Sequence, residues 1–503
     1  MVTRGGATAG PAGLLMAKSL SPFDQAAGTI VPTFGDAPYY VGLVVCSRNP
    51  LAPRRHAVRS SHLHPRPEPV GPRLMGDAHR MSRNELPPSR AHLQRPLDMG
   101  LLSRRGVLRA AGGLALAGAL GTATARSAGA APSTWTHPGA LHNPGDINRA
   151  RVRVAAGTDP WYPGWEALVD NSHSASTWTA NPQATVYRGG SYTQNYPILY
   201  NDIAAAYQNA LRWLISGDTA HADCAAAICN AWSSTLTTID GNSDACLAAG
   251  IYGWQFANVG ELLRDYSAFD LDAFQQMMLN VFYPWNHGFL RDHNFACITN
   301  YWANWDLCNM ASIMAIAILC EDGDKFDEAV TYFLSGAGNG SIDHAVPDLY
   351  TDDDGYGLGQ WQESGRDQGH SIMGMGQMGA LCEMAWNQGV DLYGYDSRKF
   401  LQAAQYVAKY NIGQDVPYTT YSWGSGQNCA YNEQTEISSA SRGQVRPVWA
   451  MLHFHYNRRL GLDDKYISSM YYDLVGTEGG GGDYGSTSGG YDQLGFGTLM
   501  YAK

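Results

Sequence analysis

Basic residues are scarce in most of this chain, and their scarcity excludes one large class of partners. The 503 residues include 34 Lys and Arg, but 16 of these lie within positions 1–130, together with only 6 of the 45 Asp and Glu. The remaining residues hold 18 basic and 39 acidic side chains, a net charge of −21. Proteins that bind nucleic acid neutralise phosphates with clustered Lys and Arg. We therefore expect no nucleic-acid partner. If the ligand is an anion, the few basic side chains must be clustered at its binding site.

Closely spaced cysteine pairs are absent, which argues against a metal centre. Eight of the nine cysteines lie after residue 130, and no two of them form a CxxC pair of the kind common in zinc sites. An even number of cysteines in an exported chain permits disulfides, but spacing does not identify the pairs. Several cysteines lie in apolar helical runs, where a buried free thiol fits equally well. We expect no metal and no cofactor.

Long apolar runs are also absent, so the sequence offers no membrane span. The best candidate follows Arg104 and Arg105 and ends at Leu120, and it is too short and too rich in Gly and Ala. Twin arginines, a short apolar core and small residues before position 131 are the ordered parts of a twin-arginine export signal. The sequence predicts this signal at 99–130, after a disordered extension or misplaced start at 1–98. Residues 131–503 are then a secreted, monomeric domain with no membrane partner.

Period-two alternation, which marks strands, is almost missing after residue 130. Apolar residues instead recur at three and four positions, in stretches joined alternately by short and long connections. This pattern is typical of stacked helical hairpins, so the expected fold is all-α, an (α/α) toroid or incomplete barrel with long loops and a Gly-rich C-terminal tail. A helix is expected to open at 147, and others are expected at 161–169, 198–215, 222–236, 251–266, 271–283, 300–319, 326–334, 368–386, 398–410 and 447–460, with a loop rich in His and Asn at 284–299.

The stretch from Gln360 to Met378 places polar groups of several kinds directly before a helix. Arg366 and His370 are four positions apart and Asp367 is three before His370, so a helix would project all three from one face. Trp361 precedes them and is a candidate to contact substrate. The alternative is an ordinary surface ion pair at a helix start.

A second candidate stretch, Asn300 to Asp306, offers amides and aromatic rings together. Asn300 and Asn304 are four positions apart, and Trp305 lies beside them, which suits hydrogen bonding and stacking to a sugar ring. Gln255 belongs to the same set, because amide side chains recur near the starts of the expected inner helices. The loops before those helices would lie together at one end of the toroid. The helix N-termini there carry partial positive charge, which favours the binding of carboxylates. The alternative is that the tryptophans are core and the asparagines cap the helix.

A third stretch carries further cations and a tyrosine. Arg442 and Arg446 precede Pro447, which suits a first helical turn, and Tyr431 lies on the loop before them. Loop salt bridging is the competing explanation for the arginines. Together the three stretches fit β-elimination beside a uronic acid, in which Asn, His and Arg neutralise the carboxylate and a Tyr or His moves the C5 proton. A tyrosine with its ordinary pKa of about 10 needs a nearby cation for this role.

From about Pro138 to its C-terminus, the sequence resembles the alginate-lyase superfamily of α/α-toroid polysaccharide lyases, and most closely the glucuronan-lyase-like branch. The resemblance rests on the segments 301–306, 363–370, 446–449 and 496–499. It implies an Asn/His pair that neutralises the uronate, fitted by Asn304 and His370, a proton-carrying Tyr, for which we choose Tyr431 over Tyr456, and a nearby Arg. The substrate it implies is an acidic polysaccharide.

One departure from the family pattern concerns the substrate. The adjacent Asn-His motif of the best-known alginate lyases is absent, because Ile298, Thr299 and Asn300 stand before Tyr301. Alginate itself is therefore in doubt as the substrate.

Two other functional classes remain open. A glycoside hydrolase would use two carboxylates, such as Glu363 and Asp367 or the run 352–354. A non-catalytic glycan-binding protein would bind polyuronate without turnover.

Overall fold

The structure, a computed structural model, describes residues 126–127, 130–424, 429, 431–485 and 490–503. The extension expected at 1–98 and nearly all of the signal expected at 99–130 lie outside these residues. Both therefore stay predictions, and the domain expected at 131–503 is the part described below.

Helices dominate the described residues, which confirms the all-α class. Short π-helical segments at Met278–Phe282, Phe454–Arg459 and Met470–Val475 extend α6, α13 and α14, and 3₁₀ turns lie at Ser172–Ser174 and His293–Phe295. The α-helices are α1 Pro144–Ala155, α2 Trp161–Val169, α3 Tyr196–Ser216, α4 Thr219–Ser233, α5 Asp244–Leu263, α6 Leu271–Met277, α7 Tyr283–Asp292, α8 Ala303–Cys320, α9 Gly323–Ser335, α10 Ile342–Ala345, α11 Gln368–Asn387, α12 Tyr395–Asn411, α13 Trp449–His453, α14 Lys465–Ser469 and α15 Gly497–Tyr501.

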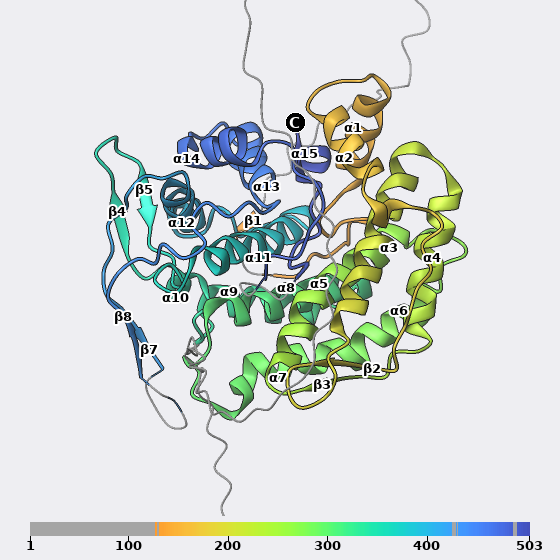
Figure 1. Ribbon diagram of the computed structural model, residues 1–503, viewed down its shortest axis with the longest axis horizontal. Helices are drawn as coiled ribbons and strands as arrows, with labels where there is room; N and C mark the ends of the chain where they lie inside the picture. Colours follow the sequence, from red (N-terminus) through yellow and green to blue (C-terminus); the bar gives the residue numbers. More distant parts are fainter. Residues whose placement is uncertain (1–125, 128–129, 425–428, 430, 486–489) are drawn as a thin grey trace, which may run out of the picture. The chain divides into compact units, whose positions relative to one another are not determined.

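The helices pack in chain order, as helical hairpins do. Helices α3, α5, α8, α11 and α13 each contact the next in that series, with α5 and α8 side by side over their length (Figure 1). Each also contacts a following helix, in the pairs α3 with α4, α5 with α7, α8 with α9, α11 with α12 and α13 with α14. This order of neighbours is the one expected for an (α/α) toroid.

Helix α8 shows why the inner series is buried. It is apolar on nearly all sides, and 94% of its residues are buried, so it packs against neighbours all round. Among the described residues it is the one helix long and apolar enough to cross a membrane, and its burial is that of a core helix. Helix α3 shows typical end signals, with Pro197 in its first turn and Gly217 in the left-handed conformation at its C-cap.

Strands are short and few in the described residues, where they form two-stranded pairs. Two pairs are parallel, β1 Arg126–Ser127 with β6 Val390–Asp391 and β2 Thr185–Arg188 with β3 Thr238–Gly241. Two are antiparallel, β4 Leu349–Thr351 with β5 Gly357–Gly359 and β7 Tyr421–Trp423 with β8 Asn432–Gln434. The last pair joins the loops that meet the start of α8.

Candidate functional site

The N-terminus of α8 is capped by another part of the chain. Trp302, its N-cap residue, makes no side-chain capping bond. Instead, the backbone N–H of Ala303 donates to Gln362 Oε1 at 3.0 Å, and that of Asn304 donates to Glu363 Oε1 at 2.7 Å. The first N–H groups of a helix lack internal partners, so these side chains satisfy them. The segment between β5 and α11 is thereby held against the start of α8.

Glu363 links two of the candidate residues directly. The Asn304 Nδ2 atom donates to both carboxylate oxygens of Glu363, at 3.0 and 2.9 Å, and Arg366 Nη1 donates to Oε2 at 3.1 Å. Glu363 is fully buried and Asn304 is only 2% exposed, whereas about a quarter of the Arg366 side chain is exposed. The Asn304 amide therefore hydrogen bonds to a carboxylate of the protein itself rather than facing a sugar, and Arg366 is the member of this trio that reaches the surface.

Asp367 fixes both the N-terminus of α11 and the imidazole ring of His370. Its carboxylate accepts the His370 backbone N–H at 2.7 Å as an N-cap and meets His370 Nδ1 at 2.6 Å. Arg366 Nε lies 3.9 Å from the same Asp367 oxygen. Burial works to raise the pKa of Asp367, but the hydrogen bond and charge of His370, with Arg366, bring that pKa below its ordinary value. The arrangement fixes the imidazole with Nδ1 toward Asp367.

A continuous series of contacts therefore joins Asn304, Glu363, Arg366, Asp367 and His370. Among the described residues, no hydrogen bond occupies His370 Nε2 or Arg366 Nη2. An imidazole held through one nitrogen by a carboxylate leaves the other to exchange a proton. The site thus offers a proton acceptor beside a guanidinium.

Aromatic rings pack around the guanidinium. Arg366 lies over the Trp302 ring, 4.7 Å from its centroid, and Trp423 of β7 packs on Trp302 with centroids 4.3 Å apart. Tyr421, on the same strand, stacks on Trp423 and donates its hydroxyl to Asn339 Oδ1 at 3.1 Å. Burial raises the pKa of Tyr421, which therefore stays protonated near neutrality.

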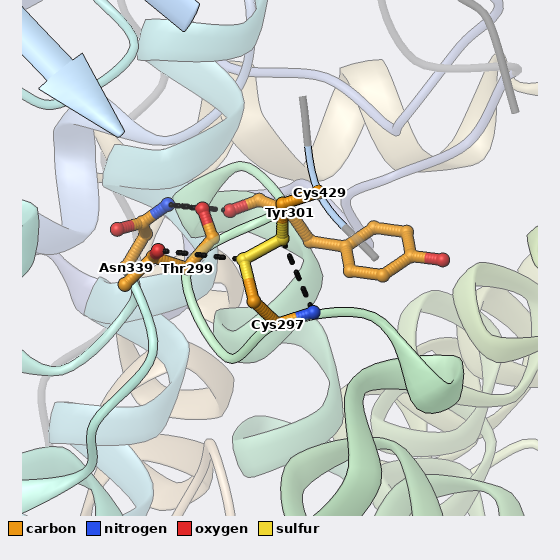
Figure 2. The surroundings of a disulfide bond; sticks show 5 residues. All are labelled: Cys297, Thr299, Tyr301, Asn339 and Cys429. Atoms are coloured by element: carbon orange, nitrogen blue, oxygen red, sulfur yellow. Dashed lines mark hydrogen bonds between the residues drawn. A yellow bond between two sulfur atoms is a disulfide. The ribbon is translucent and has the colours of Figure 1, made fainter. Parts of the chain in front are cut away.

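A disulfide between Cys297 and Cys429 ties the β7–β8 connection to the turn before α8 (Figure 2). Their Cα atoms are 5.7 Å apart, and the Cys297 N–H donates to Cys429 Sγ at 3.1 Å. Asn339 holds the same turn from the other side, because its Nδ2 atom donates to the carbonyls of Thr299 at 3.1 Å and Tyr301 at 2.6 Å. These bonds fix the backbone that leads into Trp302.

The expected helix at 300–319 starts three residues late, which separates Asn300 from Asn304. Helix α8 begins at Ala303 because Trp302 has extended backbone angles, with φ −67° and ψ 157°. Asn300 lies in a turn in which its N–H donates to the Cys297 carbonyl. The expectation that Asn300 and Asn304 share one helix face is therefore wrong. Trp305 is half-buried and packs on Tyr301.

Three other candidates for substrate binding are almost fully enclosed. Trp361 and Arg446 are 0% exposed and Gln255 is 2% exposed, so none presents surface to a sugar here. Gln255 Nε2 donates to the Tyr491 carbonyl at 2.7 Å, because the C-terminal tail packs on α5. Arg446 pairs with buried Asp492 at 3.2 Å. These residues support the surrounding structure.

Tyr431 and Arg442 lie on the chain that covers the site but are engaged elsewhere. Tyr431 is 63% exposed and donates its hydroxyl to Glu433 at 2.8 Å. Arg442 donates to the carbonyls of Tyr410 at 2.6 Å and Gln414 at 2.9 Å, which supports the loop-bridging alternative. Tyr456, the second choice of tyrosine, is fully buried.

Three residues of this region, Trp423, Tyr421 and Asn339, are not among those that the sequence pattern indicates. The alternation of Tyr421 and Trp423 about an exposed serine is a strand signal, but a run of three residues is too short to distinguish a strand from a loop. Among the described residues, no group of three or more His, Cys, Asp or Glu could hold a metal ion.

The chain is similar to known alginate lyases. A sequence model of the alginate lyase family matches residues 175–416. Among solved structures, alginate lyase A1-III from Sphingomonas species A1 is 14% identical with a TM-score of 0.47, and covers 74% of this chain and 98% of its own. An alginate lyase from Bacteroides ovatus is 14% identical with a TM-score of 0.40, and covers 56% of this chain and 84% of its own. No curated protein matches the sequence.

A variant of A1-III complexed with tetrasaccharide is 15% identical with a TM-score of 0.46, over 74% of this chain and 97% of that one. The family match spans most of the inner helices, from before α3 to the end of α12, and includes the whole series of contacts from Asn304 to His370. The match identifies the protein as a polysaccharide lyase acting on polyuronates, with a likeness to the alginate lyase family that covers just under half of the chain.

Proposed function

We propose that this lyase is a secreted monomer that cleaves glucuronan or an alginate-like polyuronate by β-elimination. The observation that carries the proposal is the series of contacts that brings Arg366 and His370 to one Asp367 oxygen atom. The absence of the Asn-His motif before Tyr301 supports glucuronan over alginate, and the twin arginines at 104 and 105 support export.

β-Elimination needs the C5 proton to become acidic before it can be removed. Arg366 is the group that we assign to neutralise the uronate carboxylate. Its Nη1 atom is held by Glu363, and Nη2 is not hydrogen bonded within the described residues, which supports this assignment. Guanidinium groups bind carboxylates through paired N–H donors. With the carboxylate neutralised, negative charge that develops on loss of the C5 proton is delocalised into it.

His370 is the group that we assign to remove the C5 proton. Its Nδ1 atom lies 2.6 Å from Asp367, so Nε2 is the nitrogen that accepts a proton, and the Asp367 carboxylate stabilises the imidazolium that forms. The electron pair of the C5–H bond then forms the C4–C5 double bond as the C4–O bond breaks. The leaving oxygen takes up a proton. Tyr431 is the group that we propose to supply it, which requires its hydroxyl to turn from Glu433 toward the sugar.

The structure weighs against the hydrolase alternative. Glu363 is buried with four donor contacts, and Asp367 has a lowered pKa, so neither is suited to protonate a glycosidic oxygen near neutral pH. In the run 352–354, Asp352 is paired with Lys409 at 2.8 Å.

A panel assay tests the proposal. Purified protein is incubated with glucuronan, polymannuronate and polyguluronate, and ultraviolet absorbance of the unsaturated uronate is followed with reducing ends. Both signals rising together on glucuronan supports the proposal. Reducing ends without absorbance indicate a hydrolase, and binding without either signal indicates a glycan-binding protein.

A further inference from the structure

We propose that Glu363 is a positioning residue that aims Arg366 at the substrate carboxylate. The inference rests on the proposed function, since Arg366 must contact a uronate for its orientation to matter. Glu363 is fully buried, so it does not touch a polymer itself, and any effect on the reaction passes through its neighbours.

Both oxygen atoms of the Glu363 carboxylate accept hydrogen bonds. Oε1 accepts the Asn304 N–H at 2.7 Å and Nδ2 at 3.0 Å, while Oε2 accepts the same Nδ2 at 2.9 Å and Arg366 Nη1 at 3.1 Å. A buried carboxylate is stable only when it is paired and hydrogen bonded, so this set keeps Glu363 in one orientation. Charge-assisted bonds of this kind fix direction as well as contribute energy.

The guanidinium is thereby fixed in two independent directions. Glu363 holds Nη1 in its plane, and the Trp302 ring supports one of its faces at 4.7 Å. Trp302 itself is fixed by Trp423. The remaining edge of the Arg366 guanidinium, which carries Nη2, is the one that would bind the substrate carboxylate. A small displacement of this edge would lower the reaction rate strongly.

Charge and shape both matter at position 363. In Glu363→Gln, the new amide group would set a donor against the donors of Asn304 or Arg366, because a neutral amide has one acceptor oxygen where the carboxylate has two. Arg366 would then lose its in-plane anchor while keeping its charge. We expect weaker binding of the uronate, seen as a higher KM more than a lower kcat.

Glu363 also caps the N-terminus of α8. Gln362 caps the same helix end, so a substitution of Gln362 is the control for the loss of capping alone. Gln362 Oε1 accepts the Ala303 N–H at 3.0 Å and makes no bond to Arg366. Gln362→Ala should therefore lower the melting temperature through loss of a cap, with an effect on kcat/KM that is independent of residue 366.

A double-mutant cycle tests the proposal with glucuronan as substrate. Glu363→Gln should lower kcat/KM by about 10- to 100-fold in the wild-type background and by less than about 3-fold in an Arg366→Ala background. Should Glu363→Gln fail to fold, Asn304→Ser takes its place, because it removes the Nδ2 contacts to Glu363 and leaves the charge. Asn304→Ser should lower kcat/KM less than Glu363→Gln does, and this decrease should also disappear in the Arg366→Ala background.

Additive losses would overturn the inference, since they would show that residue 363 acts independently of Arg366. A lowered melting temperature with unchanged kcat/KM would also overturn it, because Glu363 would then be a structural cap alone. A wild-type enzyme that releases no unsaturated product would instead overturn the proposed function, so the two failures are distinguishable.

Discussion

At the scale of single residues, the account depends first on the imidazole held by Asp367. His370→Ala removes the proposed proton acceptor, so kcat should fall by about 10²- to 10⁴-fold while the melting temperature changes little. The Asp367 side chain still caps α11 through the His370 backbone N–H, which the substitution keeps. Initial rates of ultraviolet absorbance on glucuronan measure the change.

His287 gives a matched control for that substitution. It is a surface histidine on α7, 41% exposed in its side chain and 2.8 Å from Glu328, so it too is a carboxylate-paired imidazole. His287→Ala should leave kcat unchanged. Equal losses in both variants, or a His370→Ala enzyme with full activity, would remove His370 from the reaction.

Glu478 is a second residue with a measurable consequence, here on stability. Its carboxylate accepts the N–H groups of Trp449 at 2.7 Å and Ala450 at 2.8 Å, and Oε2 has no hydrogen-bond partner. Burial raises the pKa of Glu478 from 4.5 to about 8, against the lowering effect of these two bonds. Between those values the folded state holds a proton that the unfolded state has released, so stability falls as pH rises.

Glu478→Gln should abolish this part of the pH dependence. We expect the variant to gain stability relative to the wild type as the pH rises from about 5 to about 8, since its side chain stays neutral throughout. Melting temperatures across that range, with the exposed Glu436→Gln as control, measure the difference. A parallel pH dependence in the wild type and Glu478→Gln would show that Glu478 does not hold the proton.

At the scale of elements, the Cys297–Cys429 disulfide joins β7 and β8 to α8 across 132 residues of sequence. Closing so long a loop removes entropy from the unfolded chain, and typical disulfides contribute about 2–4 kcal/mol. The double variant Cys297→Ser/Cys429→Ser should lose stability of about that size in denaturant unfolding. The double variant should also have a higher KM, because Trp423 would support Trp302, and through it Arg366, less firmly.

The half-buried free thiol of Cys320 is the control for this prediction. Reductant should lower the stability of the wild type and of Cys320→Ser alike, and leave the double variant unchanged. A double variant as stable as the wild type would mean that the disulfide contributes nothing to the fold.

The existence of most helices was predictable, and their ends were not. Apolar spacing predicts α3 and α11 to within a few residues, because each buries one continuous face. Helix α5 starts seven residues before its expected position 251, since its first turns are small residues without a clear period. Helix α7 was expected as a loop, because His and Asn mask its apolar positions.

The site was predictable in part, for a local reason. Arg366, Asp367 and His370 lie within five residues, so they are close in the structure as well. The expectation that one helix face projects all three is wrong, because α11 begins at Gln368 and Asp367 meets His370 as the extended N-cap residue. Their link to Asn304 runs through Glu363, which the sequence suggested only as a hydrolase carboxylate. The packing of Trp423 and the partner of Cys297 are tertiary contacts across more than a hundred residues, and no local pattern specifies them.

At the scale of the whole molecule, the net charge of −21 after residue 130 opposes binding of an anionic polymer. Repulsion between exposed charges is strong at 0.01 M salt, where the screening length is about 30 Å, and weak at 0.15 M, where it is about 8 Å. KM for glucuronan should therefore fall as salt rises over this range. A KM that rises instead would show that local cations such as Arg366 dominate the approach.

The central claim is that this lyase eliminates across the C4–C5 bond of a uronate with Arg366 and His370 at the reacting sugar. The most direct measurement is the rate of unsaturated-uronate absorbance on glucuronan for the wild type and Arg366→Ala, with reducing ends counted in parallel. The account predicts one absorbing product for each new reducing end in the wild type and a loss of both signals in the variant. Reducing ends formed without absorbance, or an Arg366→Ala enzyme that keeps the wild-type rate, would contradict it.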